Sequence, residues 1–395
     1  MIKKDEEFVT NLKKGGFIYD GDVDEVETLK FLQKSVQFSG NSLSLTVAPT
    51  LGCNFGCTYC YQGEHNTFEK MTSEVQEDLI NFIKARIKKI SMLSITWYGG
   101  EPLLAMDIIE SLTNKFIELC SENNISYNAG IITNGYHLNP ETAQKLVDLK
   151  VTSVQVTLDG PKEYHDLKRP LKDGSGTFDG IISNLKQCKG IFKSGISLRV
   201  NTDHINKDKV KDIIDILKEN DLLTDVLPYL GHVDATNEFY DNEKCLTPDD
   251  FLNVKKNFIN ELCKYVDIEP VLNQYPQVTL NACLADSDTG YVIDPSGNLS
   301  KCWCDIDIDE FKVGTLKDGI AKFGRIVDYF NYNIFSDPKC VDCKIVPICL
   351  GGCPRRRIDN VHQICTSTKE SLYNTIIETA KQRDSTLSSL ELYEI

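Results

Sequence analysis

The stretch that decides the fold is residues 48–63, APTLGCNFGCTYCYQG, which places three cysteines on one short loop with the spacing C-x3-C-x2-C. The thiolates of Cys53, Cys57 and Cys60 leave a tetrahedral zinc site one ligand short. They suit a cubane [4Fe–4S] cluster in which one iron stays open and can chelate a small molecule. The alternative is a zinc loop that takes a distant fourth ligand such as His65.

Strand-like and helix-like segments alternate on both sides of this loop. The β-rich runs are 43–48, 93–98, 127–132, 152–158, 195–201 and 225–230. The clearest helix lies over 73–89, where Ser73 and Gln76 form a capping box and apolar residues recur every four positions. Six strands that alternate with helices predict an α/β fold with a parallel sheet. After about residue 270 the pattern breaks into turns rich in Cys, Gly, Asp and Pro, which predicts a second unit.

Short polar motifs lie at the carboxyl ends of four of the predicted strands. They are Gly99-Gly100-Glu101-Pro102, Thr133-Asn134-Gly135, Leu158-Asp159-Gly160 and Arg199-Val200-Asn201. Ligand-binding groups gather where the carboxyl ends of parallel barrel strands meet. Taken singly, each motif is also ordinary turn chemistry.

Together with the cysteine triplet and Tyr59, these motifs resemble those of the radical S-adenosylmethionine (SAM) superfamily. The resemblance implies a partial (β/α)6 barrel in which a cluster held by Cys53, Cys57 and Cys60 binds SAM. The reduced cluster would cleave SAM to methionine and a 5′-deoxyadenosyl radical, so these three cysteines are the expected catalytic residues. The residues expected to contact SAM are Tyr59, Gly99, Gly100, Glu101, Pro102, Thr133, Asn134, Asp159, Arg169, Arg199 and Asn201. Among them, Glu101 is expected to bind the ammonium group.

Cysteines return between residues 283 and 365 with the spacings C-x13-G-x4-C and C-x2-C-x5-C-x3-C, followed by one more cysteine. These spacings resemble the SPASM extension of radical SAM enzymes, which carries two auxiliary [4Fe–4S] clusters. The resemblance assigns an outer cluster to Cys340, Cys343, Cys349 and Cys365, and an inner cluster to Cys283, Cys302 and Cys353. A zinc ribbon with four thiolate ligands over 340–365 is the alternative.

Two residues beside the inner cluster leave their roles open. Cys304 lies two positions after Cys302, and residues two apart in an extended chain point the same way. Cys304 therefore either completes the inner cluster or leaves it an open site for a substrate thiolate. Asp305 is a candidate general base or hydrogen-bonding group near the substrate, or else one of several solvated acids in residues 304–311.

Composition narrows the class of protein. The 395 residues carry a net charge of −15, which argues against the basic face of a nucleic-acid binder. No apolar run is long enough to span a membrane and the N-terminus lacks a secretory core, so a cytoplasmic location is expected. The fifteen cysteines would stay reduced there, which favours metal chemistry. The cysteines outside the two groups, which are expected to be structural, are Cys120, Cys188, Cys245 and Cys263.

The expected organisation has five parts. They are an N-terminal cap or substrate-docking segment over 1–42, the barrel over 43–235, a bridging helical region over 236–274, the SPASM domain over 275–370, and a C-terminal helix or tail over 371–395.

Among radical SAM enzymes, the motifs resemble those of maturases of ribosomally made peptides. That resemblance implies hydrogen abstraction from a precursor peptide with a leader sequence, followed by an intramolecular crosslink, with a thioether as the first choice. Two alternatives are an anaerobic sulfatase-maturating enzyme that makes formylglycine from Cys or Ser, and a multi-cluster electron carrier without SAM chemistry. The expected electron donor is a flavodoxin or ferredoxin, which would dock on Arg355-Arg356-Arg357.

Overall fold

The computed structural model describes residues 9–10, 13, 21–62, 68–233, 240–266, 280 and 283–359, together with positions 372, 376, 377, 380 and 381. Within these residues the strands form one ten-stranded sheet, in the order β10-β9-β8-β7-β1-β2-β3-β4-β5-β6. The residues His65 and Cys365 and most of the expected C-terminal helix lie outside the described part of the chain.

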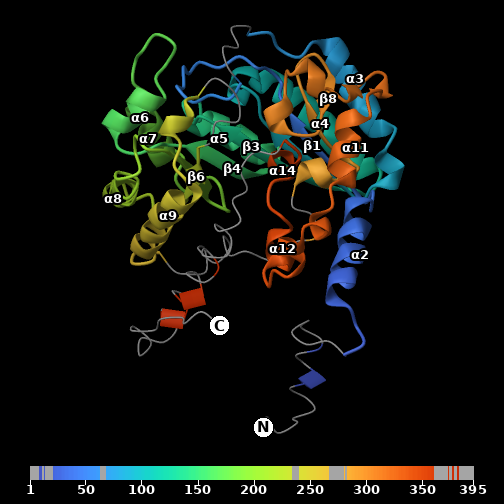
Figure 1. Cartoon of the computed structure of the whole chain (residues 1–395). Coiled ribbons are helices and arrows are strands. Elements are labelled where there is room, and N and C mark those ends of the chain that lie inside the picture. Colours follow the sequence, from blue (N-terminus) through green and yellow to red (C-terminus); the bar gives the residue numbers. More distant parts are fainter. Residues whose placement is uncertain are drawn as a thin grey trace.

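Six neighbouring strands of this sheet are parallel, and each confirms one β-rich run of the sequence. They are β1 (Ser42–Val47), β2 (Met92–Trp97), β3 (Ser126–Thr133), β4 (Val151–Thr157), β5 (Ile196–Thr202) and β6 (Val226–His232). Figure 1 shows helices packed against them, as expected of a partial barrel. Apolar side chains on these strands, such as Leu43, Ile95 and Leu198, are fully buried and form the core with the helices.

The helices of the barrel lie between the strands, with one before and one after. They are α2 (Glu25–Gln37), α3 (Ser73–Lys84), α4 (Met106–Glu122), α5 (Pro140–Asp148), α6 (Lys162–Lys168), α7 (Phe178–Gln187), α8 (Asp212–Glu219) and α9 (Pro248–Leu262). The short 3-10 turns are Ile87–Lys89, Pro102–Ala105, Asn242–Lys244, Leu284–Asp286, Trp303–Asp305, Asp309–Phe311 and Ile334–Ser336.

The start of α3 differs from the prediction. Thr72, not Ser73, is the N-cap, and its hydroxyl accepts a hydrogen bond from the Val75 amide at 3.3 Å. Gln76 instead donates its side-chain amide to the Met71 carbonyl. The predicted N-cap is therefore wrong by one position, because threonine and serine are adjacent and either can cap a helix. The predicted capping box does not form, because Val75 stands three residues after Thr72 and has no polar side chain.

The cysteine-rich region extends the same sheet from the other side of β1. Strand β7 (Gly290–Ile293) pairs with β1 in parallel, and β8 (Asn298–Ser300), β9 (Gly314–Thr315) and β10 (Gly319–Ile320) follow in antiparallel order. The remaining helices are α11 (Gly324–Asn331), α12 (Pro338–Val341), α13 (Val346–Cys349) and α14 (Pro354–Ile358). Figure 1 shows α2 beside α12, and Leu29 of α2 packs in one apolar cluster with Phe335 and Cys340.

No helix in the described segments has both the length and the apolar composition that crossing a bilayer requires.

Candidate active site

The cysteine loop begins where β1 ends. Its backbone is tied to the segment that follows α6: the Gly56 amide donates to the Pro170 carbonyl at 2.8 Å, and the Thr58 amide donates to the Lys168 carbonyl at 3.0 Å. Cys53 and Cys57 pack against the barrel core while staying half-buried. The fold therefore holds the loop across the carboxyl ends of the parallel strands, where the sequence predicted the site.

The GGEP motif clamps this loop from the end of β2. The Gly100 amide donates to the Thr50 carbonyl at 3.2 Å, and the Glu101 amide donates to the Gly52 carbonyl at 2.9 Å. A Cβ atom on Gly100 would lie 2.3 Å from the carbonyl oxygens of Gly52 and Leu51, so only glycine allows the two backbones to approach this closely.

We expect Gly100→Ala to prevent the cysteine loop from assembling a cluster. The methyl group would collide with backbone atoms of the loop, which cannot move aside as a flexible side chain would. Iron analysis after anaerobic reconstitution should show the variant lacking one cubane, about four irons, relative to wild type. Gly324→Ala is the matched control, because a Cβ there meets nothing within 4 Å. Equal iron content in both variants would contradict the clamp.

Glu101 joins the ends of β2 and β3. Its carboxylate is fully buried and accepts hydrogen bonds from the Thr133 hydroxyl at 2.7 Å, the Asn134 amide at 2.7 Å and the Leu103 amide at 3.0 Å. Burial raises the pKa of this carboxyl group. The structure thus gives Glu101 a positioning role, and its contact with the SAM ammonium group stays a prediction.

Asn134 connects the end of β3 to the cysteine loop. Its side-chain amide donates to the Asn54 side chain at 2.8 Å, and its side-chain oxygen accepts from the Tyr136 amide at 2.9 Å. Asn54 was not singled out from the sequence, although it directly follows the first cysteine of the motif.

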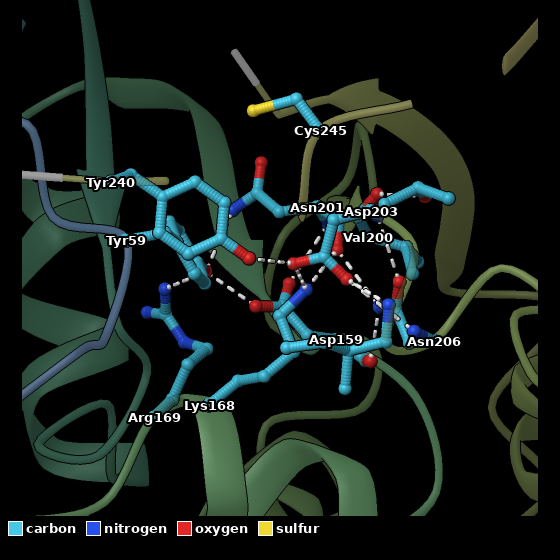
Figure 2. A network of polar contacts seen from close by, with 12 residues as sticks. Tyr59, Asp159, Lys168, Arg169, Val200, Asn201, Asp203, Asn206, Tyr240 and Cys245 are labelled. Carbon is cyan, nitrogen blue, oxygen red and sulfur yellow. Dashed lines mark hydrogen bonds and ion pairs between the residues drawn. The ribbon is translucent and has the colours of Figure 1, made fainter. Parts of the chain in front are cut away.

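Four predicted SAM-contacting residues meet at the hydroxyl group of Tyr59 (Figure 2). This hydroxyl donates to the Asp159 carboxylate and accepts from Arg169 Nη1 at 2.7 Å and from the Asn201 amide group at 2.9 Å. The other Asp159 oxygen accepts from the Asn201 backbone amide at 2.8 Å. Burial raises the pKa of Tyr59 well above its ordinary value, so the phenol keeps its proton.

A buried ion pair supports this network from below. Lys168 Nζ lies 2.8 Å from the Asp203 carboxylate, and neither side chain is exposed to solvent. Lys168 also donates to the Asn201 carbonyl at 2.9 Å, and the Tyr240 hydroxyl donates to Asp203 at 2.7 Å. Asn206 donates to the carbonyls of both Asp159 and Asn201 at 2.8 Å (Figure 2). The sequence analysis missed these residues, although Asp203 and Asn206 directly follow β5 and continue its polar end.

His165 fixes the turn that carries Asp159. Its Nδ1 accepts from the Asp159 amide at 3.0 Å, and its Nε2 lies 2.9 Å from the Thr177 hydroxyl. Burial lowers the pKa of His165 to about 3. The ring is therefore neutral at neutral pH and accepts at Nδ1, which leaves Nε2 to donate to Thr177.

This shift predicts how acid affects stability. Below about pH 6.5, His165 becomes protonated in the unfolded chain. In the folded chain it stays neutral down to about pH 3. The free energy of unfolding should therefore fall by about 1.4 kcal/mol per pH unit over that window from this residue alone. His165→Asn keeps an acceptor for the Asp159 amide but does not titrate. Urea unfolding at several pH values should show a shallower acid slope for the variant than for wild type, and equal slopes would contradict the assignment.

The two arginines lie on different sides of the network. Arg199 Nε donates to the Asn201 side chain at 2.7 Å, and a Cβ on Gly231 of the next strand would come within 2.7 Å of its guanidinium. Arg169 is buried, its charge interacts with Cys57, and its Nε–H has no hydrogen-bond partner among the described residues. An unpaired buried donor close to Cys53 and Cys57 fits an anionic ligand such as a SAM carboxylate or a cluster sulfide.

The described C-terminal cysteines divide into the two sets that the resemblance implied. Cys283, Cys302 and Cys304 lie around the buried Tyr329, and Cys353 is close enough to interact electrostatically with all three. We call these four cysteines the inner set. The outer set is Cys340, Cys343 and Cys349; the first two lie in the apolar cluster that also holds Val346 of α13, the helix that Cys349 ends.

In the part of the chain that the structure describes, no three His, Cys, Asp or Glu side chains already surround a common point in the manner of a metal site. The chemistry of each set still suits an iron–sulfur cluster, because the candidate ligands are all thiols. Of the expected structural cysteines, Cys120 and Cys188 are buried, while Cys245 and Cys263 are half-buried.

Asp305 is not one of the solvated acids. Its side chain is fully buried and accepts from Arg355 Nε at 2.8 Å and from the Tyr329 hydroxyl at 3.3 Å, with Arg325 Nε at 3.6 Å. The solvated interpretation is therefore wrong, because two arginines draw the carboxylate into the protein. Its role as a general base stays a prediction, and the geometry shown is that of an anchor beside Cys304.

The proposed donor-docking patch at residues 355–357 is wrong for two of its three arginines. The side chains of Arg355 and Arg357 are 11% and 6% exposed. Arg355 pairs with Asp305 and Asp359, and Arg357 donates to the Gly351 carbonyl and to Cys340 Sγ. Buried carboxylates and sulfur atoms attract these guanidinium groups inward, which a run of three arginines in a sequence cannot reveal.

The comparisons with known proteins agree with this geometry. Residues 47–220 match the family model of the radical SAM superfamily. The cysteine-type anaerobic sulfatase-maturating enzyme of Clostridium novyi (strain NT) is 25% identical over 353 residues, which cover 81% of this chain and 90% of that enzyme. The radical SAM cyclopropyl synthase TigE of Paramaledivibacter caminithermalis is 23% identical over 384 residues, which cover 86% of this chain and 74% of TigE.

Solved structures show the same fold. Native anSMEcpe with bound AdoMet superposes with a TM-score of 0.65 at 20% identity, over 88% of this chain and all of that one. SuiB of Streptococcus suis bound to S-adenosylmethionine gives 0.54 at 15% identity, over 89% of this chain and 83% of SuiB. Residues 47–220 of the chain therefore form a radical SAM domain. The relatives that the chain matches include sulfatase-maturating enzymes, a radical SAM cyclopropyl synthase and a GTP 3',8-cyclase, all of them enzymes, so the interpretation as an electron carrier without SAM chemistry is wrong.

Proposed function

We propose that the chain is a peptide maturase that abstracts hydrogen from a precursor peptide and closes an intramolecular thioether crosslink. The observation that carries the proposal is the contact of Trp303, the residue between Cys302 and Cys304, with Tyr98, which directly precedes the GGEP motif. The ring of Tyr98, at the end of β2, lies 5.6 Å from that of Trp303, and Tyr98 interacts electrostatically with both Cys60 and Cys304. A substrate held there would lie between the cysteine triplet, where the radical is expected to form, and the inner set, which is expected to accept an electron.

The family implies SAM and one [4Fe–4S] cluster, which Cys53, Cys57 and Cys60 would hold. When bound, that cluster supplies the electron that cleaves SAM to methionine and a 5′-deoxyadenosyl radical. The residues of this chain bind and orient the reactants. Arg169 presents its unpaired Nε–H to an anionic group, while Tyr59 and Asn201 hold that arginine and Asp159 in place.

Two auxiliary [4Fe–4S] clusters complete the proposal. We assign the inner one to Cys283, Cys302, Cys353 and, as its fourth ligand, Cys304. Cys304 lies in one apolar cluster with Cys283 and Cys302, which supports this choice over an open site. The outer one takes Cys340, Cys343, Cys349 and the predicted ligand Cys365. Together they form the SPASM domain over 275–370.

Thioether formation removes one hydrogen atom, one proton and one electron from the peptide, and each has a destination. The deoxyadenosyl radical takes one hydrogen atom from a peptide carbon and leaves as 5′-deoxyadenosine. The thiol of a peptide cysteine then loses its proton, its sulfur bonds to the carbon radical, and one electron departs. When bound at the inner and outer sets, the auxiliary clusters would supply a one-electron acceptor for this closure. A flavodoxin or ferredoxin is the proposed source of the first electron.

The N-terminal segment over 1–42 is our candidate for docking the leader of the precursor peptide. Helix α2 supports this assignment, since it leaves Phe31 70% and Leu32 40% exposed. Apolar side chains exposed on a helix suit an apolar partner segment.

Formation of formylglycine is the second candidate, because the Clostridium novyi relative is a sulfatase-maturating enzyme and this chain covers 90% of its length. Both reactions begin with removal of hydrogen from a peptide carbon. They differ in whether the sulfur of the substrate is kept in a new bond or lost.

The test is co-expression of the chain with a short cysteine-containing peptide encoded beside its gene, followed by mass spectrometry. A thioether makes the peptide lighter by two hydrogen atoms and protects the cysteine from alkylation. Formylglycine from cysteine instead exchanges the sulfur for a carbonyl oxygen and yields an aldehyde. An unchanged peptide, with active SAM cleavage on another substrate, would contradict the proposed substrate class.

A further inference from the structure

The short helix α14 directs its third arginine into the outer set of cysteines. Arg357 Nη1 donates to Cys340 Sγ at 3.6 Å, and Arg357 Nε donates to the Gly351 carbonyl. The guanidinium also faces the Tyr332 ring at 6.0 Å, and only 6% of the side chain is exposed. A buried charge that contacts sulfur in this way is a specific arrangement, because arginine is rarely buried without a partner.

The backbone is shaped to admit this guanidinium. Gly351 adopts a φ of +79°, and a Cβ atom there would lie 2.6 Å from Ile334 Cγ2 and 3.1 Å from Arg357 Cζ. A glycine in the left-handed region therefore both leaves room for the side chain and turns its carbonyl toward Nε. The guanidinium is held at two points, on Gly351 and on Cys340.

Arg355 and Arg357 lie at different distances from the described carboxylates. Arg355 Nε lies 2.8 Å from the Asp305 carboxylate and 3.7 Å from that of Asp359. For Arg357, the Asp337 carboxylate lies 3.9 Å from Nη1, at the limit of an ion pair. The positive charge of the Arg357 guanidinium lies within hydrogen-bonding distance of Cys340 Sγ, so it acts on that sulfur directly.

We propose that Arg357 is a positioning residue that raises the reduction potential of the outer cluster through its N–H bond to Cys340. The inference rests on the proposed function, in which Cys340 ligates that cluster. Reduction adds a negative charge to a cluster, and hydrogen bonds to its sulfur atoms together with nearby positive charge stabilise the reduced state. The outer cluster consequently accepts an electron more readily than it would with a neutral residue at position 357.

The first test detects the guanidinium nitrogen beside the cluster directly. The full-length chain with Cys53, Cys57 and Cys60 replaced by alanine carries only the auxiliary clusters. With ¹⁵N-labelled arginine, pulsed electron paramagnetic resonance of the reduced protein should show a coupling between the outer cluster and a guanidinium nitrogen. The coupling should vanish in Arg357→Lys and persist in Arg356→Met. Absence of coupling in the unsubstituted arginine background would overturn the inference.

The second test is potentiometric. Arg357→Met should lower the ratio of reduced to oxidised outer cluster about tenfold at a fixed potential, which is ~59 mV for one electron. The potential of Arg357→Lys should lie between those of Arg357→Met and wild type, since lysine keeps the positive charge but lacks the planar N–H donors of the guanidinium. Arg356→Met is the matched control from the same helix and should not change the potential. An unchanged potential in Arg357→Met at full iron content contradicts the inference, and if that variant loses iron, the nitrogen coupling decides.

Iron analysis of the unsubstituted full chain separates this inference from the proposed function. About twelve irons per chain indicate three cubanes, and about four indicate the SAM cluster alone. Four irons would overturn the auxiliary clusters themselves. Twelve irons without coupling and without a shift in potential would overturn only the role of Arg357.

Discussion

Replacement of Cys57 by alanine is expected to abolish production of 5′-deoxyadenosine from SAM. Cys57 is the central cysteine of the triplet, lies half-buried against the core, and interacts with Cys53, Cys60 and Arg169. Two thiolates cannot hold the cluster whose fourth iron site binds SAM. With dithionite as reductant, the rate of 5′-deoxyadenosine formation should fall by about 10³-fold or more, which is the loss of at least ~4 kcal/mol of transition-state stabilisation.

Cys120→Ala is the control for this substitution. Cys120 lies in α4, is 2% exposed and packs in the hydrophobic core, so its loss should affect stability and not SAM cleavage. Retention of full cleavage by Cys57→Ala would contradict the assignment of the triplet. Loss of cleavage in both variants would show that folding, not ligation, had been measured.

The second large effect is expected from the buried ion pair of Lys168 and Asp203. Lys168→Met leaves the Asp203 carboxylate in a dry environment with the Tyr240 hydroxyl as its remaining side-chain donor among the described contacts. Removal of one partner of a buried pair costs about 3–5 kcal/mol, because the other charge stays buried and uncompensated. Urea unfolding should show a loss of that size in the free energy of unfolding.

Two further variants make the result specific. Lys168→Met combined with Asp203→Leu should recover part of the loss, since no charge is then left unpaired. Lys70→Met should change stability little, because the Lys70–Asp107 pair lies at the surface with side chains 42% and 69% exposed. If Lys168→Met were as mild as Lys70→Met, the pair would not support the network below Tyr59.

The barrel and its site could be predicted because each depends on local patterns. The six parallel strands appear as separate runs of β-branched and apolar residues. Each strand in the structure begins within two residues of the start of its predicted run. The polar motifs lie where those strands end, so Tyr59, Asp159 and Asn201 meet once the strands are aligned. Their hydrogen bonds to one another, however, depend on the exact side-chain geometry.

Contacts between distant segments could not be predicted in the same way. Strands β7 to β10 have only two to four residues each, which is too short for a periodic signal, so their continuity with β1 was not foreseen. Lys168 and Asp203 resemble surface charges in the sequence, and only the fold brings them together. Asp305 and Arg355 are fifty positions apart and neutralise each other inside the cysteine-rich region.

The most direct test of the account follows one hydrogen atom. The reconstituted enzyme is incubated with SAM, a reductant and the neighbouring precursor peptide, which carries deuterium on the carbon atoms that become crosslinked. We predict that one equivalent of deuterated 5′-deoxyadenosine forms for each thioether. A crosslinked peptide with 5′-deoxyadenosine free of deuterium, or no 5′-deoxyadenosine under strong reduction, would contradict the central claim that this chain abstracts hydrogen from a peptide.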